Sequence, residues 1–238
     1  MKRRALAAWM TSPLAVVTGL MTLASIVLML TLDRPIAELI HQYTRRGDQQ
    51  FWRSVSRIGE SWFYVAFFVF LYLGGRALFL WSAPQPAARV YAGIARAGLF
   101  GLASYALSGA IVHSLKYVLG RFRPKHLIGQ GDYGFAVLAG DPSYNSFPSG
   151  HAQSAFTAAC VLSVLFPKAA WAFLSLAVLV AASRVLGGAH FVSDVLFGSY
   201  VGIVSVLLIR RHWFADVGAI RGGVFRPSAG YGGVVHGK

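Results

Sequence analysis

The chain has 238 residues, of which 56% are hydrophobic, 14% aromatic and only 13% charged, and its mean hydropathy is +0.57. Because a soluble domain usually carries about 25% charged residues, this composition excludes an ordinary soluble protein and indicates an integral membrane protein. The formal charge of +14 does not indicate a nucleic-acid partner, because nucleic-acid binders are not built mainly of apolar runs; anionic headgroups and the positive-inside rule account for it.

Six stretches are apolar enough to cross a bilayer, which takes about 20 residues in a helix. In chain order they are Pro13–Leu32, Trp62–Trp81, Ala97–Ser114, His151–Phe166, Ala169–Val185 and Phe191–Ile209. The sequence therefore predicts an all-α fold, an integral membrane bundle of six transmembrane helices. The fourth and fifth stretches are short, so we expect their polar ends to lie below the membrane surface. Residues 1–4 resemble the basic start of a signal peptide, but residues 30–33 offer no small-residue cleavage site, so we expect an uncleaved anchor.

Lysine and arginine residues set the expected orientation. With six spans both termini share one side of the membrane. That side has Asp216 as its one acid and carries a series of basic residues: Lys2, Arg3, Arg4, Arg89, Arg96, Lys168, Arg210, Arg211, Arg221 and Arg226. We therefore expect a multi-pass protein of the bacterial inner membrane with both termini in the cytoplasm. The opposite, periplasmic face would then hold all three of the motif regions described below.

The domain organisation follows from the spans. We expect a six-helix membrane domain over residues 1–216, with its motifs within 116–194, and a disordered cytoplasmic tail over the glycine-rich residues 217–238. In the first outer loop, the apolar residues Ile36, Leu39, Ile40 and Tyr43 recur at helical spacing. This pattern predicts a short helix, which either lies in the outer membrane interface or packs as a lid on the bundle.

His190 and Asp194 stand four residues apart at the start of the last span, so they share one helix face. Asp194 is the only carboxylate within any predicted span, and a buried carboxylate is tolerated when it is paired. An imidazole N–H is a natural partner, and this pairing leaves the other ring nitrogen basic and free to act as a nucleophile. The alternative is a hydrogen bond that only ties two helical turns together.

Ser149, Gly150 and His151 stand where an outer loop enters the fourth span. A helix N-terminus offers unpaired N–H groups and the positive end of the helix dipole, which suit an anion. Gly150 would let the backbone approach a phosphate, Ser149 would add a hydroxyl donor, and His151 could protonate a leaving alkoxide as a general acid. The alternative is a helix start without a ligand.

Three cations complete this candidate site. Lys116, Arg123 and Arg184 could surround the equatorial oxygens of a phosphoryl group, since arginine gives bidentate contacts and lysine a point charge. For Arg121 and Lys125 we expect contacts with lipid headgroups instead. No group of Asp, Glu, His or Cys residues has the spacing of a metal site, and Cys160 is the only cysteine, so the sequence predicts no metal and no cofactor.

Taken together, these residues resemble the type 2 phosphatidic acid phosphatase (PAP2) superfamily. Its pattern is K-x6-R-P, then P-S-G-H, then S-R-x5-H-x3-D. The chain matches it with Lys116 and Arg123-Pro124, with Pro148-Ser149-Gly150-His151, and with Ser183-Arg184, His190 and Asp194. The resemblance covers Lys116 to Asp194, about a third of the chain, together with the layout of six spans.

The resemblance implies a metal-independent phosphatase that hydrolyses a lipid phosphate or pyrophosphate monoester through a phosphohistidine. It implies that His190 attacks phosphorus, that Asp194 orients His190, and that His151 protonates the leaving oxygen and later activates water. It also assigns the phosphate to five residues: Lys116, Arg123, Ser149, Gly150 and Arg184.

Two other functions stay open at this point. The same site could serve a phosphotransferase that passes the phosphoryl group to another lipid. A non-enzymatic transporter could use the ionisable cluster as a relay, but its charges would be spread through the membrane depth. For a phosphatase, the expected partners are the bilayer and one lipid phosphate: undecaprenyl pyrophosphate, lipid A, phosphatidylglycerophosphate or phosphatidic acid.

Overall fold

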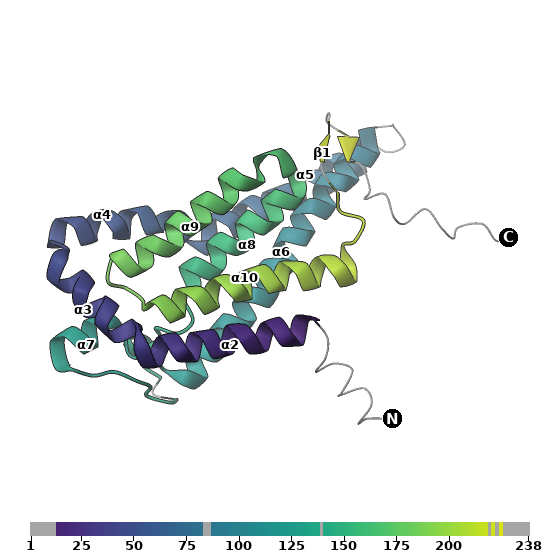
Figure 1. Ribbon diagram of the computed structural model, residues 1–238. Coiled ribbons are helices and arrows are strands. Elements are labelled where there is room, and N and C mark those ends of the chain that lie inside the picture. Colours follow the sequence, from purple (N-terminus) through teal and green to yellow (C-terminus); the bar gives the residue numbers. More distant parts are fainter. Residues whose placement is uncertain (1–12, 83–86, 139, 219, 222–223, 226–238) are drawn as a thin grey trace, which may run out of the picture.

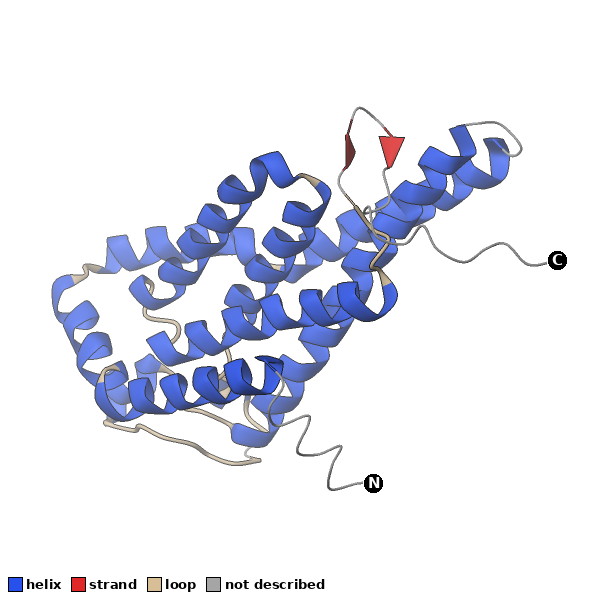
Figure 2. Cartoon of the chain, turned by 45° about the vertical axis from the view of Figure 1, so that its right-hand side comes forward, coloured by secondary structure: helices blue, strands red, loops and turns tan. Residues whose placement is uncertain are grey.

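The computed structural model describes residues 13–82, 87–138, 140–218, 220–221 and 224–225. Its helices, in chain order, are α2 (Pro13–Thr31), α3 (Asp33–Tyr43), α4 (Arg46–Ser56), α5 (Ser61–Ser82), α6 (Ala87–Leu119), α7 (Pro124–Gln130), α8 (Gly150–Leu165), α9 (Ala170–Leu186) and α10 (Val192–Trp213). Three 3₁₀ turns, η1 (Arg57–Gly59), η2 (Pro142–Tyr144) and η3 (Pro167–Ala169), join some of them. Strands β1 (Ile220–Arg221) and β2 (Val224–Phe225) form one antiparallel pair. The all-α bundle predicted from the sequence is confirmed (Figures 1 and 2).

The number of spans differs from the six expected. Within the described residues, five helical runs are long and apolar enough to cross a membrane: Pro13–Thr31, Arg46–Ser82, Ala87–Leu119, Pro167–Leu186 and Val192–Trp213. The fourth predicted span corresponds to α8, which has 16 residues and falls short of the length of about 20 needed for a straight crossing. A count of six spans is therefore not confirmed.

Helix α8 lies at the centre of the bundle, between α6, α9 and α10 (Figure 1). Its buried residues are mostly small: Ala152, Gln153, Ser154, Ala155, Thr157, Ala158, Ala159, Val161 and Leu165. Two glycines of α10 allow its close approach to α8. A Cβ at Gly198 would overlap the backbone of Ser149, and one at Gly202 would lie 2.6 Å from the carbonyl oxygen of Gln153. The start of α8 is therefore held directly against α10.

The outer helices expose apolar side chains. Helix α2 packs mainly against α10, and its outward residues include Leu20, Leu23 and Leu30. Helix α5 packs along α6, where Phe68 and Phe100 belong to the main buried cluster, while Phe70 and Leu73 face outward. In a bilayer these exposed apolar surfaces contact acyl chains rather than water.

The connections sort to the two ends of the bundle. Helix α2 begins and α10 ends at one end, on the right in Figure 1, whereas α3, α4 and α7 gather at the other end. Residues 1–4, the predicted start of the anchor, lie outside the described residues. So does most of the predicted tail over residues 217–238, whose described part includes the β1–β2 pair.

The predicted short helix in the first outer loop is α3. Two of its apolar residues, Ile36 and Ile40, line a cavity beside His190, while Leu39 and Tyr43 are 54% and 74% exposed. One face of α3 therefore covers the bundle end as a lid would, and the other face is free to meet the membrane interface.

Candidate active site

The three motif regions meet at one end of the bundle. Lys116 lies in the last turn of α6, His151 in the first turn of α8 and Arg184 in the last turn of α9. His190 lies in the loop from α9 to α10, and Asp194 lies in the first turn of α10. The prediction that all three regions share one face is confirmed, and this gathering at one end counts against a transport relay through the membrane depth.

His190 and Asp194 form the predicted pair. Nδ1 of His190 lies 3.6 Å from Oδ2 of Asp194, and both side chains are buried. The hydroxyl of Ser146 donates to the same carboxylate oxygen at 2.6 Å and lies 3.5 Å from Nδ1 of His190. The backbone N–H of Phe191 donates to it at 2.9 Å. These contacts fix which ring nitrogen of His190 faces the carboxylate.

Burial governs the charge of His190. Loss of hydration lowers the pKa of His190 to about 3, and the positive charge of Lys116 acts in the same direction, whereas the hydrogen bond with Asp194 opposes it. The imidazole is therefore neutral near pH 7. With Nδ1 directed at Asp194, Nε2 keeps its lone pair, which is the form a nucleophile requires.

Arg121 occupies an unexpected position. Its side chain is 1% exposed, so the prediction that it contacts lipid headgroups is wrong. Nη1 of Arg121 donates to Oδ1 of Asp194, and Nη2 donates to Oδ2 of Asp33 at 2.8 Å. The guanidinium also lies 4.5 Å from the centre of the Phe191 ring, a cation–π contact. A guanidinium buried this deeply is stable because it is shared between two carboxylates.

The sequence could not reveal this ion pair, because Asp33 lies 88 residues before Arg121. Lys125, by contrast, is exposed at the start of α7. Its position agrees with the expected contact with headgroups, and it also lines the cavity described below.

Ser149 precedes the first residue of α8 with an extended backbone. Its N–H donates to the carbonyl oxygen of Asp194 at 2.9 Å. Its hydroxyl is buried and has no hydrogen-bond partner among the described residues. This hydroxyl is therefore available to donate a hydrogen bond at the start of α8. Gly150 follows directly, and a Cβ there would lie 3.9 Å from the side chain of Lys116.

The three expected phosphate-binding cations have no carboxylate partner within the described part of the chain. Lys116 donates to the carbonyl oxygen of Asn145 at 2.6 Å, and Arg123 approaches the same oxygen at 3.5 Å. Arg184 donates from Nη1 to the hydroxyl of Ser56 at 2.6 Å, while its buried Nε has no hydrogen-bond partner among the residues that the structure describes. Unpaired cations that gather around one point create an anion site.

Their charges act on one another. Arg123 and Arg184 lie close enough to influence Lys116, and all three influence the imidazole of His151. Burial lowers the pKa of Arg123. The three cations therefore form a cluster of positive charge that a bound phosphate group would neutralise. Among the described residues, no group of three or more His, Cys, Asp or Glu side chains gathers where it could hold a metal ion.

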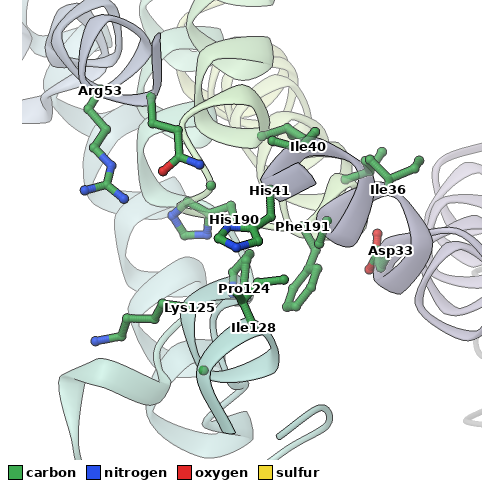
Figure 3. A pocket seen from close by; sticks show the side chains of 16 residues that line it. Asp33, Ile36, Ile40, His41, Arg53, Pro124, Lys125, Ile128, His190 and Phe191 are labelled. Carbon is green, nitrogen blue, oxygen red and sulfur yellow. The ribbon is translucent and has the colours of Figure 1, made fainter. Parts of the chain in front are cut away.

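A cavity of about 260 Å³ opens beside His190. Figure 3 shows its lining, with Ile36 and Ile40 of α3 on one side and Arg53 of α4 on the other. His41 of α3 points into the same space as His190. The motifs did not predict Arg53 or His41, because both lie in the first outer loop and no spacing connects them to the later motifs.

Comparison with known proteins identifies the same family that the sequence motifs indicate. The family model of the PAP2 superfamily matches residues 97–218. The lipid A 1-phosphatase of Rhizobium johnstonii is 30% identical over 159 residues, which cover 64% of this chain and 64% of that protein. The undecaprenyl-diphosphatase of Sulfolobus acidocaldarius is 30% identical over 143 residues, which cover 58% and 67% of the two chains.

Two solved structures share the fold. Aquifex aeolicus LpxE superimposes with a TM-score of 0.54 at 22% identity, covering 76% of this chain and 96% of its own. The PAP2-type phosphatidylglycerolphosphate phosphatase of Bacillus subtilis superimposes with a TM-score of 0.58 at 20% identity, covering 83% and 94% of the two chains.

Proposed function

The chain belongs to the PAP2 superfamily, and from this premise we propose that it is a metal-independent phosphatase that removes a phosphate group from a membrane lipid. The observation that carries the proposal is the cluster of three cations without carboxylate partners, Lys116, Arg123 and Arg184, at the same bundle end as the buried pair of His190 and Asp194. The matched region spans 64% of the length of the Rhizobium protein.

The first chemical step uses the neutral imidazole. Nε2 of His190 attacks phosphorus, forming a P–N bond while the bond from phosphorus to the lipid oxygen breaks. Asp194, whose Oδ2 lies 3.6 Å from Nδ1, stabilises the positive charge that develops on the ring. Lys116, Arg123 and Arg184 offset the negative charge on the equatorial phosphoryl oxygens. The free hydroxyl of Ser149 donates to one of them.

His151 transfers the protons in both steps of the reaction. Burial and the three neighbouring cations lower the pKa of His151 to about 4, and the negative charge of a bound phosphate offsets those cations, so that His151 holds a proton when the substrate is in place. His151 gives this proton to the departing lipid oxygen, so that the lipid leaves as an alcohol, or as a phosphate if the substrate is a pyrophosphate. The neutral His151 then takes a proton from water. The resulting hydroxide attacks phosphorus, the P–N bond breaks, and inorganic phosphate leaves with His190 restored.

The cavity supports a lipid substrate. Its wall combines apolar residues such as Ile36 and Ile128 with the polar side chains of His41, Arg53 and Lys125, which suits a charged headgroup that carries an apolar chain. Undecaprenyl pyrophosphate, lipid A, phosphatidylglycerophosphate and phosphatidic acid all have this character. We place the site at the periplasmic face of the bacterial inner membrane, with both termini cytoplasmic, because the basic residues favour that orientation.

A panel assay tests this function. The purified protein in detergent is given each of these four lipids, and released inorganic phosphate is measured. His190→Ala is the inactive comparison, and His212→Ala, an exposed position in the last turn of α10, is the matched control. We expect release with at least one lipid from the wild type and His212→Ala only. Release that survives in His190→Ala would contradict the mechanism.

A further inference from the structure

Asp33 is a buried carboxylate to which the mechanism above gives no role. It is the first residue of α3, directly after the first span, and it lies outside residues 97–218 that match the family model. Its side chain is 0% exposed. Burying a carboxylate is unfavourable unless hydrogen bonds and opposite charge compensate for the lost water, so this position requires an explanation.

The contacts of Asp33 all lead to the active site. Its carboxylate accepts hydrogen bonds from Nη2 of Arg121 at 2.8 Å, from the backbone N–H of Ser193 at 3.0 Å and from the hydroxyl of Ser193. Ser193 lies in the first turn of α10, where backbone N–H groups have no partner within the helix. Asp33, which belongs to α3, therefore caps the start of α10 at Ser193, the residue before Asp194.

The charges of this network do not cancel. Arg121 stands between Asp33 and Asp194, so one positive and two negative side chains leave a single negative charge beside His190. Without Asp33, Arg121 would neutralise Asp194 completely. His190 gains positive charge when it bonds to phosphorus, and a neighbouring net negative charge stabilises that state.

We propose that Asp33 is a positioning residue for the reaction of His190: it holds Arg121 and the first turn of α10, and so keeps Asp194 aligned and its negative charge effective on the imidazole. This inference rests on the proposed function, in which His190 is the nucleophile. It gives α3, which lies outside residues 97–218, a part in positioning the catalytic groups.

Asp33→Asn tests the proposal, because it keeps one oxygen that can accept from the backbone N–H of Ser193, while it removes the charge and the oxygen that accepts from Arg121. We expect kcat on a lipid phosphate to fall by about ten- to a hundredfold, the size of effect that follows loss of the outer partner that orients a metal-bound histidine, with KM changed by less than about threefold. Asp216→Asn is the matched control, since Asp216 pairs with Arg96 at the opposite end of the bundle. It should keep the wild-type kcat.

The double variant Asp33→Asn/Arg121→Gln separates charge from packing. It removes one charge of each sign, so Asp194 again leaves one net negative charge beside His190. We expect its kcat to exceed that of Asp33→Asn by at least about fivefold, a non-additive effect that lost packing would not produce. If Asp33→Asn does not fold, the double variant replaces it, and its kcat should lie within about tenfold of the wild type.

The outcomes separate the two proposals. Wild-type hydrolysis of lipid phosphates tests the function, and the ratio of variant to wild-type kcat tests Asp33. An active wild type with an equally active Asp33→Asn, or a double variant no faster than Asp33→Asn, overturns the role of Asp33 alone. A folded double variant whose kcat is more than about a hundredfold below that of the wild type also overturns the role of Asp33 alone. A wild type that releases no phosphate from any lipid overturns both.

Discussion

The backbone N–H of Ser149 donates to the backbone carbonyl of Asp194 at 2.9 Å, which joins the start of α8 to the start of α10. Through this bond, the serine hydroxyl expected to hold phosphate and the carboxylate expected to orient His190 keep a fixed separation. Neither helix can shift without moving the other's functional group. The proposed anion site at the start of α8 is therefore linked through the backbone to the carboxylate that orients the proposed nucleophile.

Removal of the nucleophile should abolish turnover. We expect His190→Ala to retain less than about one per cent of wild-type kcat, while its Tm shows a folded protein, because no other described group can take the place of Nε2. Asp194→Asn should also reduce kcat severely, since it disturbs both the tautomer and the orientation of His190. A folded His190→Ala protein that keeps more than a few per cent of activity would remove His190 from this role.

The buried neutral histidine should make stability sensitive to acid. His190 has a folded pKa of about 3 against an ordinary 6.5, so between these values the unfolded chain binds the proton and the folded chain does not. Its contribution is complete above about pH 6.5 and declines as the pH falls, by up to about 1.4 kcal/mol per pH unit. Between pH 7 and 5, the Tm of the wild type should therefore fall more than that of His190→Gln. Equal shifts would show that His190 does not titrate as stated.

Activity should not require a divalent metal. The phosphoryl charge is offset by Lys116, Arg123 and Arg184 in the mechanism proposed here, so hydrolysis should persist in excess EDTA. Vanadate should inhibit by occupying the phosphate position. Complete loss of activity in EDTA that magnesium restores would be the contrary result.

Ser56 should support phosphate binding through Arg184. Its buried hydroxyl accepts from Nη1 of Arg184 at 2.6 Å and donates to the carbonyl oxygen of Arg53 at 2.7 Å. We expect Ser56→Ala to reduce kcat/KM by about fivefold, the equivalent of one hydrogen bond of about 1 kcal/mol. Ser54→Ala, two residues away on the exposed side of α4, is the control and should have no effect. Equal effects from the two variants would show that the contact with Arg184 is not responsible.

Sidedness can be measured by thiol labelling in intact spheroplasts, after Cys160 is replaced by Ala. Cysteines at Gln130 and Asp141, both exposed near the active-site end, should react with an impermeant reagent. A cysteine at Lys168, exposed in η3, should react only after lysis. Two other positions that we expect to be cytoplasmic, Gln85 and Ser228, lie outside the described residues. Labelling of Lys168 but not of Asp141 in intact cells would invert the orientation.

Much of the site could be predicted because its residues fall at short spacings within single segments. His190 and Asp194 are one helical turn apart, and Ser149, Gly150 and His151 are consecutive. The position of Arg121 could not be predicted because its partner Asp33 is remote in sequence, and a cluster of three basic residues near a span end is equally typical of headgroup contact. Ser56 and Ser146 gave no signal, because serine is common in both loops and helices.

The long helices of the fold could be predicted from the sequence, but their ends and their packing could not. The apolar runs gave every long helix, but the third predicted span, Ala97–Ser114, is only the middle of α6, which extends from Ala87 to Leu119. Charged residues near both ends of α6 ended the apolar pattern before the helix itself ended. The sequence also did not reveal that α8 lies inside the bundle, since an apolar helix buried by protein resembles a short helix buried by lipid.

The buried residues of α8 are mostly small or polar, and this affects how the helix enters the membrane. A helix of 16 residues that carries Gln153, Ser154 and Thr157 on its buried faces has little affinity for lipid by itself. Thr157 and Gln153 instead hydrogen-bond Ser108 of α6. Helix α8 therefore depends on its neighbours to remain at membrane depth, and it would be inserted together with the more apolar α9 as a helical hairpin. The packing of α8 between α6, α9 and α10 is then also what brings Ser149 and His151 to the proposed catalytic end.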